Sequence, residues 1–207
     1  MNWIKEQIAL LADFLRGGFR RTAGFCALGM VGAAALGAVT GLLFPQQAAQ
    51  VLNAFMEQAE QSGVIDEAGQ MSVFSLLLNN WRAMLLSAAY GFIPFLFLPI
   101  ISLLSNGALL GLLGALVYSQ GSSLLFFAAG ILPHGVFELT ALVLSIACGV
   151  TLCKHMCELV VSNQKRVPLP SLLEDLLRVL VLLVAPLTVA AAFIECYVTP
   201  VVMNLFL

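Results

Sequence analysis

The stretch "VFSLLLNNWRAMLLSAAYGFIPFLFLPIISLLSNGALLGLLGALV" (residues 73–117) decides the fold, because it stays mostly apolar over about 45 residues. One helix needs roughly 20 apolar residues to cross the hydrocarbon layer of a bilayer. The stretch is therefore long enough for two crossings. We expect the chain to fold back within residues 94–105, where Pro94 and Pro99 disrupt helix.

The composition of the whole chain agrees with a membrane protein. Of its 207 residues, 61% are hydrophobic and only 10% are charged. A soluble domain has roughly 25% charged and 45–50% apolar residues, and a chain this short has no water-soluble core large enough for so much apolar surface. We infer an integral membrane protein whose first partner is the lipid bilayer. Because no basic patch is interleaved with aromatic residues, nucleic acid is excluded as a partner.

The apolar pattern predicts an all-α, polytopic transmembrane bundle of about five spans. The chain is expected to form a single membrane domain over residues 1–207. The predicted spans cover about 23–44, the two halves of 73–117, about 133–152 and about 177–198.

Two further helices are expected outside these spans. Residues 1–22 carry apolar side chains at helical spacing on one face, which is typical of a helix lying in the plane of the membrane interface. Residues of about 122–131 form a short apolar segment that Gly130 and Pro133 separate from the fourth span. This segment is either re-entrant or interfacial.

Positive charge predicts the orientation of the chain. Four of the nine Lys and Arg residues precede the first span, and four more lie between Lys154 and Arg178. By the positive-inside rule, the N-terminus and a basic loop over 153–176 are cytoplasmic. With five crossings, the acidic segment 45–72 and the C-terminus are then extracytoplasmic.

Polar side chains inside the predicted spans gather in the outer half of the membrane. An ionised group in hydrocarbon costs several kcal/mol unless it is paired or hydrated, so we expect Arg82 to pair with Glu138, Glu195 or both. The remaining polar residues of this group are Asn79, Asn80 and His134. Three interpretations stay open: a structural polar network, a site for a solute or proton, and side chains that separately reach toward the interface.

No catalytic or metal site, and no cofactor, is expected. His134 and Glu138 lie one helical turn apart on a shared face, but zinc proteases of the H-E-x-x-H type need a second histidine. The other histidine, His155, is predicted to be cytoplasmic. One histidine with two carboxylates is a ligand set for a metal, an alternative that we do not favour here. The C-x3-C spacing of Cys153 and Cys157 lacks the second pair that a zinc site requires.

Small residues at intervals of four predict close helix packing. Whether these ridges join helices of one chain or two copies in a homo-oligomer stays open. The residues are Gly29, Ala33, Gly37 and Gly41 in the first span, and Gly107 and Gly111 in the third.

Four motifs together give the chain a family resemblance. They are "NNWRA" (79–83), "SNGALLG" (105–111), "LPHGVFEL" (132–139) and "AAFIECYVTPVV" (191–202). With these motifs in this order, the chain resembles the stage II sporulation protein M family over nearly its whole length. The resemblance implies a non-catalytic scaffold in the bacterial plasma membrane, which recruits peptidoglycan-degrading enzymes during engulfment of the forespore.

The polar residues support a second hypothesis of a different class. Arg82, Glu138 and Glu195, with the paired asparagines, would line a cavity for a small ion or solute in a transporter or channel. The predicted break near Gly130 and Pro133 is similar to the discontinuous helices that form transporter sites.

Overall fold

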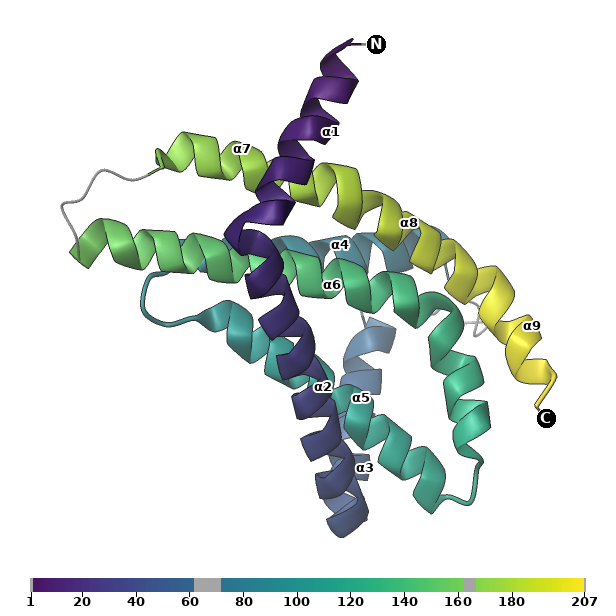
Figure 1. Ribbon diagram of the computed structural model, residues 1–207. Helices are drawn as coiled ribbons and strands as arrows, with labels where there is room; N and C mark the ends of the chain where they lie inside the picture. Colours follow the sequence, from purple (N-terminus) through teal and green to yellow (C-terminus); the bar gives the residue numbers. More distant parts are fainter. Residues whose placement is uncertain (1, 62–71, 162–166, 207) are drawn as a thin grey trace.

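The computed structural model describes residues 2–61, 72–161 and 167–206. Figure 1 shows their helices, and over these residues the regular structure is entirely helical. The α-helices are α1 (Asn2–Phe14), α2 (Arg20–Leu43), α3 (Pro45–Gln61), α4 (Val73–Ala89), α5 (Leu98–Ser119), α6 (Leu124–Val161), α7 (Leu169–Val179), α8 (Ala185–Phe193) and α9 (Thr199–Asn204). Three π-helical segments and one 3-10 turn connect some of them: η1 (Leu15–Phe19), η2 (Tyr90–Phe92), η3 (Leu180–Val184) and η4 (Ile194–Val198).

Four continuous helical segments in the described part of the chain are long and apolar enough to cross a membrane. They are Trp3–Leu43, Leu98–Ser119, Leu124–Val161 and Leu169–Asn204. The predicted second span corresponds to α4, whose 17 residues equal the lower limit of about 17 for a crossing. The all-α membrane bundle predicted from the sequence is confirmed.

The turn between α4 and α5 covers residues 90–97, so it overlaps only the start of the predicted region 94–105, and residues 98–105 are helical. Pro94 is in the connection, and Pro99 lies in the first turn of α5, where a missing backbone N–H costs nothing. Phe95 and Phe97 have positive φ angles of 67° and 45°, a backbone conformation that is uncommon for bulky residues. Contacts with α6 hold this connection: Cys153 donates from Sγ to the carbonyl oxygen of Ile93.

α2 and α5 form the most extensive helix contact among the described residues. They run parallel, because Gly29 lies against Leu103 near their N-terminal halves and Gly41 lies against Ala115 near their C-terminal ends. Parallel α2 and α5 require an even number of chain reversals between them, and the single intervening crossing of α4 gives two in the predicted topology.

α6 is the central helix of the bundle and is packed by α4 on one side and α8 on another. Ser145 of α6 donates a hydrogen bond to the carbonyl oxygen of Met84 in α4. Thr188 of α8 donates from Oγ1 to the carbonyl oxygen of Val184, and the same Oγ1 lies 3.7 Å from the sulfur of Met84. Ile146 of α6 is fully buried, as expected for the centre of the core.

Two predicted boundaries around α6 are wrong. Residues 153–161 of the predicted basic loop continue α6, and α7 begins at Leu169; residues 162–166 lie outside the described part. The segment 122–131 is likewise not a separate helix, because α6 starts at Leu124 and runs through Pro133. Charged residues do not end a helix by themselves, and a proline bends one whose neighbours support it. Figure 1 shows the N-terminal part of α6 turning sharply away from the rest.

The N-terminal region is helical, as predicted, but it is interrupted. Gly17 has non-helical backbone angles inside η1 and produces a kink between α1 and α2. Leu11 of α1 and Phe19 of η1 are buried in the main core. α1 is therefore packed against the bundle as well as amphipathic.

Candidate functional site

A histidine and two glutamates meet where α6 lies beside the C-terminal helices. The ligand atoms of His134, Glu138 and Glu195 all lie within 4.8 Å of one another. The side chain of His134 is 11% exposed and that of Glu138 is 29% exposed. This His–Glu–Glu cluster gathers three ionisable groups in apolar surroundings.

Local helix geometry explains how the cluster forms. His134 and Glu138 are one turn apart on α6, so their side chains share a face, and His134 Nε2 lies 3.9 Å from Glu138 Oε2. Glu195 comes from η4, a π-helical segment. A π-bulge changes the direction in which side chains leave a helix and is frequent at functional sites. The segment η4 lies beside α6. The helix that follows it, α9, also contacts α6, because Met203 faces Gly130.

Thr199 orients the histidine. Its Oγ1 lies 3.1 Å from His134 Nδ1, and the same hydroxyl donates to the carbonyl oxygen of Ile194 at 3.2 Å. Because a threonine hydroxyl has one hydrogen, Oγ1 accepts the hydrogen bond from His134 Nδ1–H. Nε2 is thereby the nitrogen that faces Glu138.

The expected ion pair of Arg82 with Glu138 or Glu195 is wrong. Arg82 is exposed, and in the described residues it makes no ion pair with either carboxylate. The buried face of α4 carries Leu76, Asn80 and Met84, and Arg82 follows Asn80 by about 200° around the helix, at roughly 100° per residue. It therefore points away from the bundle.

The two predicted asparagines lie on different faces of α4. Asn79 is exposed, whereas Asn80 is buried. Asn80 Nδ2 has no hydrogen-bond partner among the described residues. Of the six predicted polar residues, the structure brings together His134, Glu138 and Glu195. Within the described part of the chain, Arg82 forms no ion pair with them and Asn80 Nδ2 forms no hydrogen bond.

All six small residues predicted for helix packing lie at the contact of α2 with α5 within one chain. A Cβ at Gly37 would overlap the backbone of Ala108, and one at Gly111 would overlap the backbone of Ala34. A Cβ at Gly107 would lie 2.7 Å from the carbonyl oxygen of Met30. The remaining three, Gly29, Ala33 and Gly41, contact α5 at Leu103, Gly107 and Ala115. These ridges therefore join two helices of the same chain.

Several close contacts were missed in the sequence. Gly91 and Gly149 bring the end of α4 against α6, since a Cβ on either would overlap backbone of the other helix. Ser145 and Thr199 supply hydrogen bonds between elements. Isolated glycines and hydroxyl residues in apolar helices give no periodic signal, although Thr199 belongs to the C-terminal motif.

Cys153 and Cys157 form hydrogen bonds with the backbone of the connection between α4 and α5. Phe95 donates its N–H to Cys157 Sγ at 3.0 Å, and Cys153 bonds the same connection. His155, between them, is buried in α6 and does not join them in a ligand cluster with the described residues.

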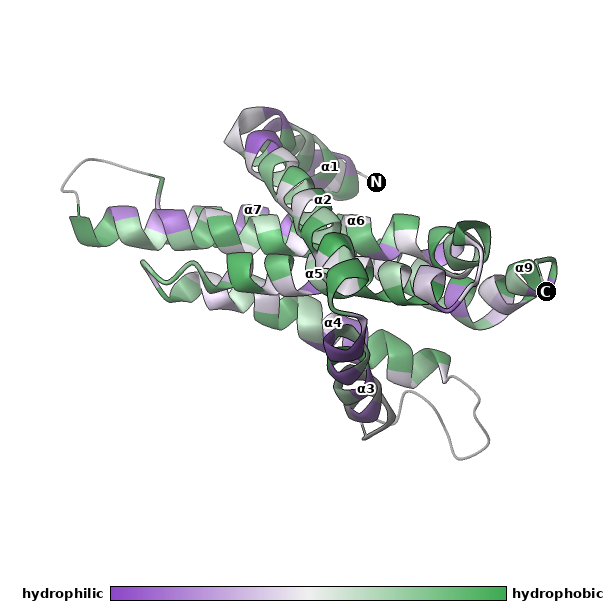
Figure 2. Cartoon of the chain, turned by 90° about the horizontal axis from the view of Figure 1, so that it is seen from below, coloured by the Kyte–Doolittle hydropathy of each residue, from purple (hydrophilic) through white to green (hydrophobic). Residues whose placement is uncertain are grey.

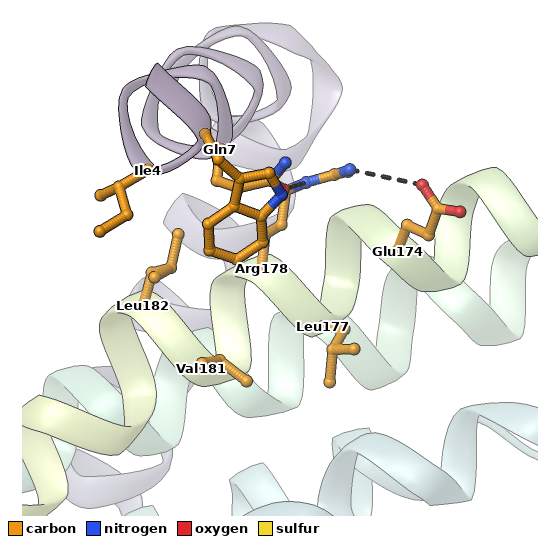
Figure 3. Close-up of a pocket in the computed structure, with 8 residues that line it drawn as sticks. Ile4, Gln7, Glu174, Leu177, Arg178, Val181 and Leu182 are labelled. Atoms are coloured by element: carbon orange, nitrogen blue, oxygen red, sulfur yellow. Dashed lines mark hydrogen bonds and ion pairs between the residues drawn. The ribbon is translucent and has the colours of Figure 1, made fainter. Parts of the chain in front are cut away.

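A separate pocket of about 440 Å³ lies between α1 and α7–η3. Figure 3 shows Arg178 reaching from α7 toward Gln7 and Glu174. The Arg178 guanidinium donates to Gln7 Oε1 at 2.7 Å, to Asp175 at 2.7 Å and to Glu174 at 3.3 Å. Arg178 therefore connects the N-terminal helix to the bundle, and Trp3 of α1 is among the residues that line the pocket.

Comparison with known proteins identifies a family and a relative of this chain. The model of the family described as stage II sporulation protein M matches residues 23–200. An uncharacterized protein of Methanocaldococcus jannaschii is 35% identical over 132 residues, which cover 63% of this chain and 72% of that relative. No solved structure gives a significant match.

Proposed function

The chain belongs to the stage II sporulation protein M family, and from that premise we propose that it is a non-catalytic membrane scaffold. In this role it recruits or localises peptidoglycan-degrading enzymes in sporulation and engulfment. It lies in the plasma membrane as a multi-pass protein, with a cytoplasmic N-terminus and an extracytoplasmic C-terminus.

The hydrophilic helix α3 is the observation that carries this proposal. Figure 2 shows α3 as a strongly hydrophilic helix set against a largely hydrophobic bundle. α3 is anchored on its inner side, where Ala48 is buried. Its outward positions are exposed and polar: Gln46, Gln47, Gln50, Asn53 and Glu57. A polar helix fixed to the outer end of two spans offers a rigid docking surface to an extracytoplasmic partner. The remainder of the acidic segment, 62–71, lies outside the described residues.

The relative directions of the helices support the proposed orientation. α2 and α5 are parallel, and His134 near the start of α6 meets Thr199 near the end of the chain. α6 and the C-terminal helices therefore run antiparallel. This alternation fits five crossings with α3 and the C-terminus on the same side.

A charge reversal on α3 tests the scaffold. The Glu57→Lys variant is compared with Glu6→Lys, an identical change at an exposed position of α1. Both tagged variants are purified from native membranes, and the co-purifying proteins are identified by mass spectrometry. We expect Glu57→Lys to lose cell-wall hydrolases and Glu6→Lys to retain them. Equal recovery of hydrolases with both variants, or none with the unmodified chain, would contradict the proposal.

Ion or proton transport is the second candidate, and the His–Glu–Glu cluster is the observation that favours it. Ionisable groups inside membrane helices commonly mark ion or proton pathways. The test is flux through liposomes that contain the purified protein. Transport predicts a proton or cation flux that Glu195→Gln abolishes and Glu57→Gln leaves unchanged. A flux equal to that of protein-free liposomes rejects this candidate.

A further inference from the structure

Among the described residues, no Lys or Arg side chain forms an ion pair with Glu138 or Glu195 of the His–Glu–Glu cluster. Glu138 and Glu195 approach within 4.8 Å of each other, and the only cationic group predicted for them, Arg82, lies on another face of α4. Two carboxylates this close in apolar surroundings repel each other unless a proton or a cation lies between them. A cation at this point removes both the repulsion and much of the cost of burial.

The orientation of His134 also suits a bound cation. Thr199 Oγ1 accepts the hydrogen bond from His134 Nδ1–H, so in this tautomer Nε2 carries the lone pair and faces Glu138. A hydrogen bond from the second ring nitrogen to a fixed acceptor is the usual means by which proteins orient a metal-binding histidine. The Nε2–Oε2 distance of 3.9 Å is longer than a hydrogen bond.

The spacing suits an ion held by all three groups. Zinc binds nitrogen and oxygen ligands at about 2.0–2.2 Å. Two ligands of a tetrahedral ion at that distance lie roughly 3.4 Å apart. The present separations of up to 4.8 Å exceed this value by at most about 1.4 Å, which is within the reach of rotations about the glutamate side-chain bonds.

We propose that His134 Nε2 and the carboxylates of Glu138 and Glu195 bind a divalent transition-metal cation of the Zn²⁺ or Mn²⁺ class. The mixed nitrogen and oxygen ligands favour this class over Mg²⁺ and Ca²⁺, which prefer oxygen alone. The site goes beyond both proposed functions. By joining α6 to η4, a bound ion ties the C-terminal helices to the centre of the bundle.

Direct binding to the full-length protein is the first test. The protein is purified in detergent, treated with a chelator, and titrated with ZnCl₂, MnCl₂ or MgCl₂ at pH 7.5. Calorimetry and elemental analysis give affinity and stoichiometry. We expect one Zn²⁺ or Mn²⁺ per chain, a higher unfolding temperature with metal, and much weaker binding of Mg²⁺. Absence of binding by the unmodified chain overturns the proposal.

Matched variants locate the ion. Glu195→Gln keeps the shape of a ligand and removes its charge, and Thr199→Val removes the group that orients His134. We expect Thr199→Val to weaken binding by roughly 10–100-fold, the range seen for orienting groups, and Glu195→Gln, which removes a ligand, to weaken binding at least as much. His155→Ala is the control, because His155 and its neighbouring cysteines are the alternative zinc ligands. Binding that survives Glu195→Gln and is lost in His155→Ala overturns the assignment. Size-exclusion elution like that of the unmodified chain shows that each variant is folded.

Discussion

Gly111→Ala tests the packing of α2 against α5. Gly111 is buried in α5, and an added Cβ would overlap the backbone carbonyl of Ala34 and approach the backbone N of Ala38 at 2.6 Å. Both obstacles are backbone atoms of α2, so no side-chain rotation relieves them. The two helices must move apart, and every contact along the ridge is loosened.

Gly32→Ala is the matched control, since it makes the same chemical change on the partner helix. A Cβ at Gly32 meets no atom within 4 Å. Alanine favours helix over glycine by about 1 kcal/mol in both variants. The difference between the variants therefore isolates the overlap, for which overpacking values of about 1–3 kcal/mol are typical.

Thermal unfolding of the two purified variants in the same detergent measures this difference. For a chain of this size, 1 kcal/mol corresponds to about 2–4 °C in the unfolding temperature. We expect Gly111→Ala to unfold roughly 2–12 °C below Gly32→Ala, from these overpacking and temperature scales. Gly29→Ala should fall between them, because its Cβ meets only the flexible end of Leu103. Equal unfolding temperatures for Gly111→Ala and Gly32→Ala would refute the described contact.

Two further predictions concern other contacts of the bundle. Arg178→Ala removes charged hydrogen bonds to Gln7 and Asp175, each typically worth about 1.5–3 kcal/mol, so we expect faster proteolysis of α1. The control is Arg16→Ala, at a side chain that is 80% exposed. This control should leave the cleavage rate unchanged. Ser145→Ala removes the hydrogen bond to Met84 and should lower stability by roughly 0.6 kcal/mol, the average for such bonds in membrane bundles. A chemical unfolding series that shows no loss for Ser145→Ala would mean that this bond does not form.

The periodicity of small residues in the sequence is sufficient to predict which faces of α2 and α5 pack closely. Glycine and alanine at every fourth position form a stripe along one side of a helix, and α2 and α5 bury that stripe. The spacing does not identify the helix against which each stripe packs. The structure shows that the stripes of α2 and α5 pack against each other within one chain.

The polar cluster was predicted only in part, and depth along the helix explains why. His134, Glu138, Glu195 and Arg82 were placed at similar depths, yet depth does not specify the face from which a side chain leaves the helix. Arg82 differs from the buried Asn80 by two positions, which turns it away from the bundle. The π-helical segment around Glu195 also shifts the register, and an ideal helical pattern does not anticipate it.

The boundaries of α6 required three-dimensional information. Lys154 and His155 suggested a loop, but His155 is buried and the helix continues to Val161. Similarly, Pro133 was expected to begin a helix and instead lies within one. In both cases packing against neighbouring helices outweighs the local signal.

Photocrosslinking from α3 tests the central claim most directly. A photoreactive amino acid replaces exposed Asn53 of α3 or, as the control, exposed Glu6 of α1, and native membranes are illuminated. The scaffold account predicts covalent adducts with extracytoplasmic wall-degrading enzymes from position 53 and none of these from position 6. Adducts with such enzymes from both positions, or from neither, would contradict it.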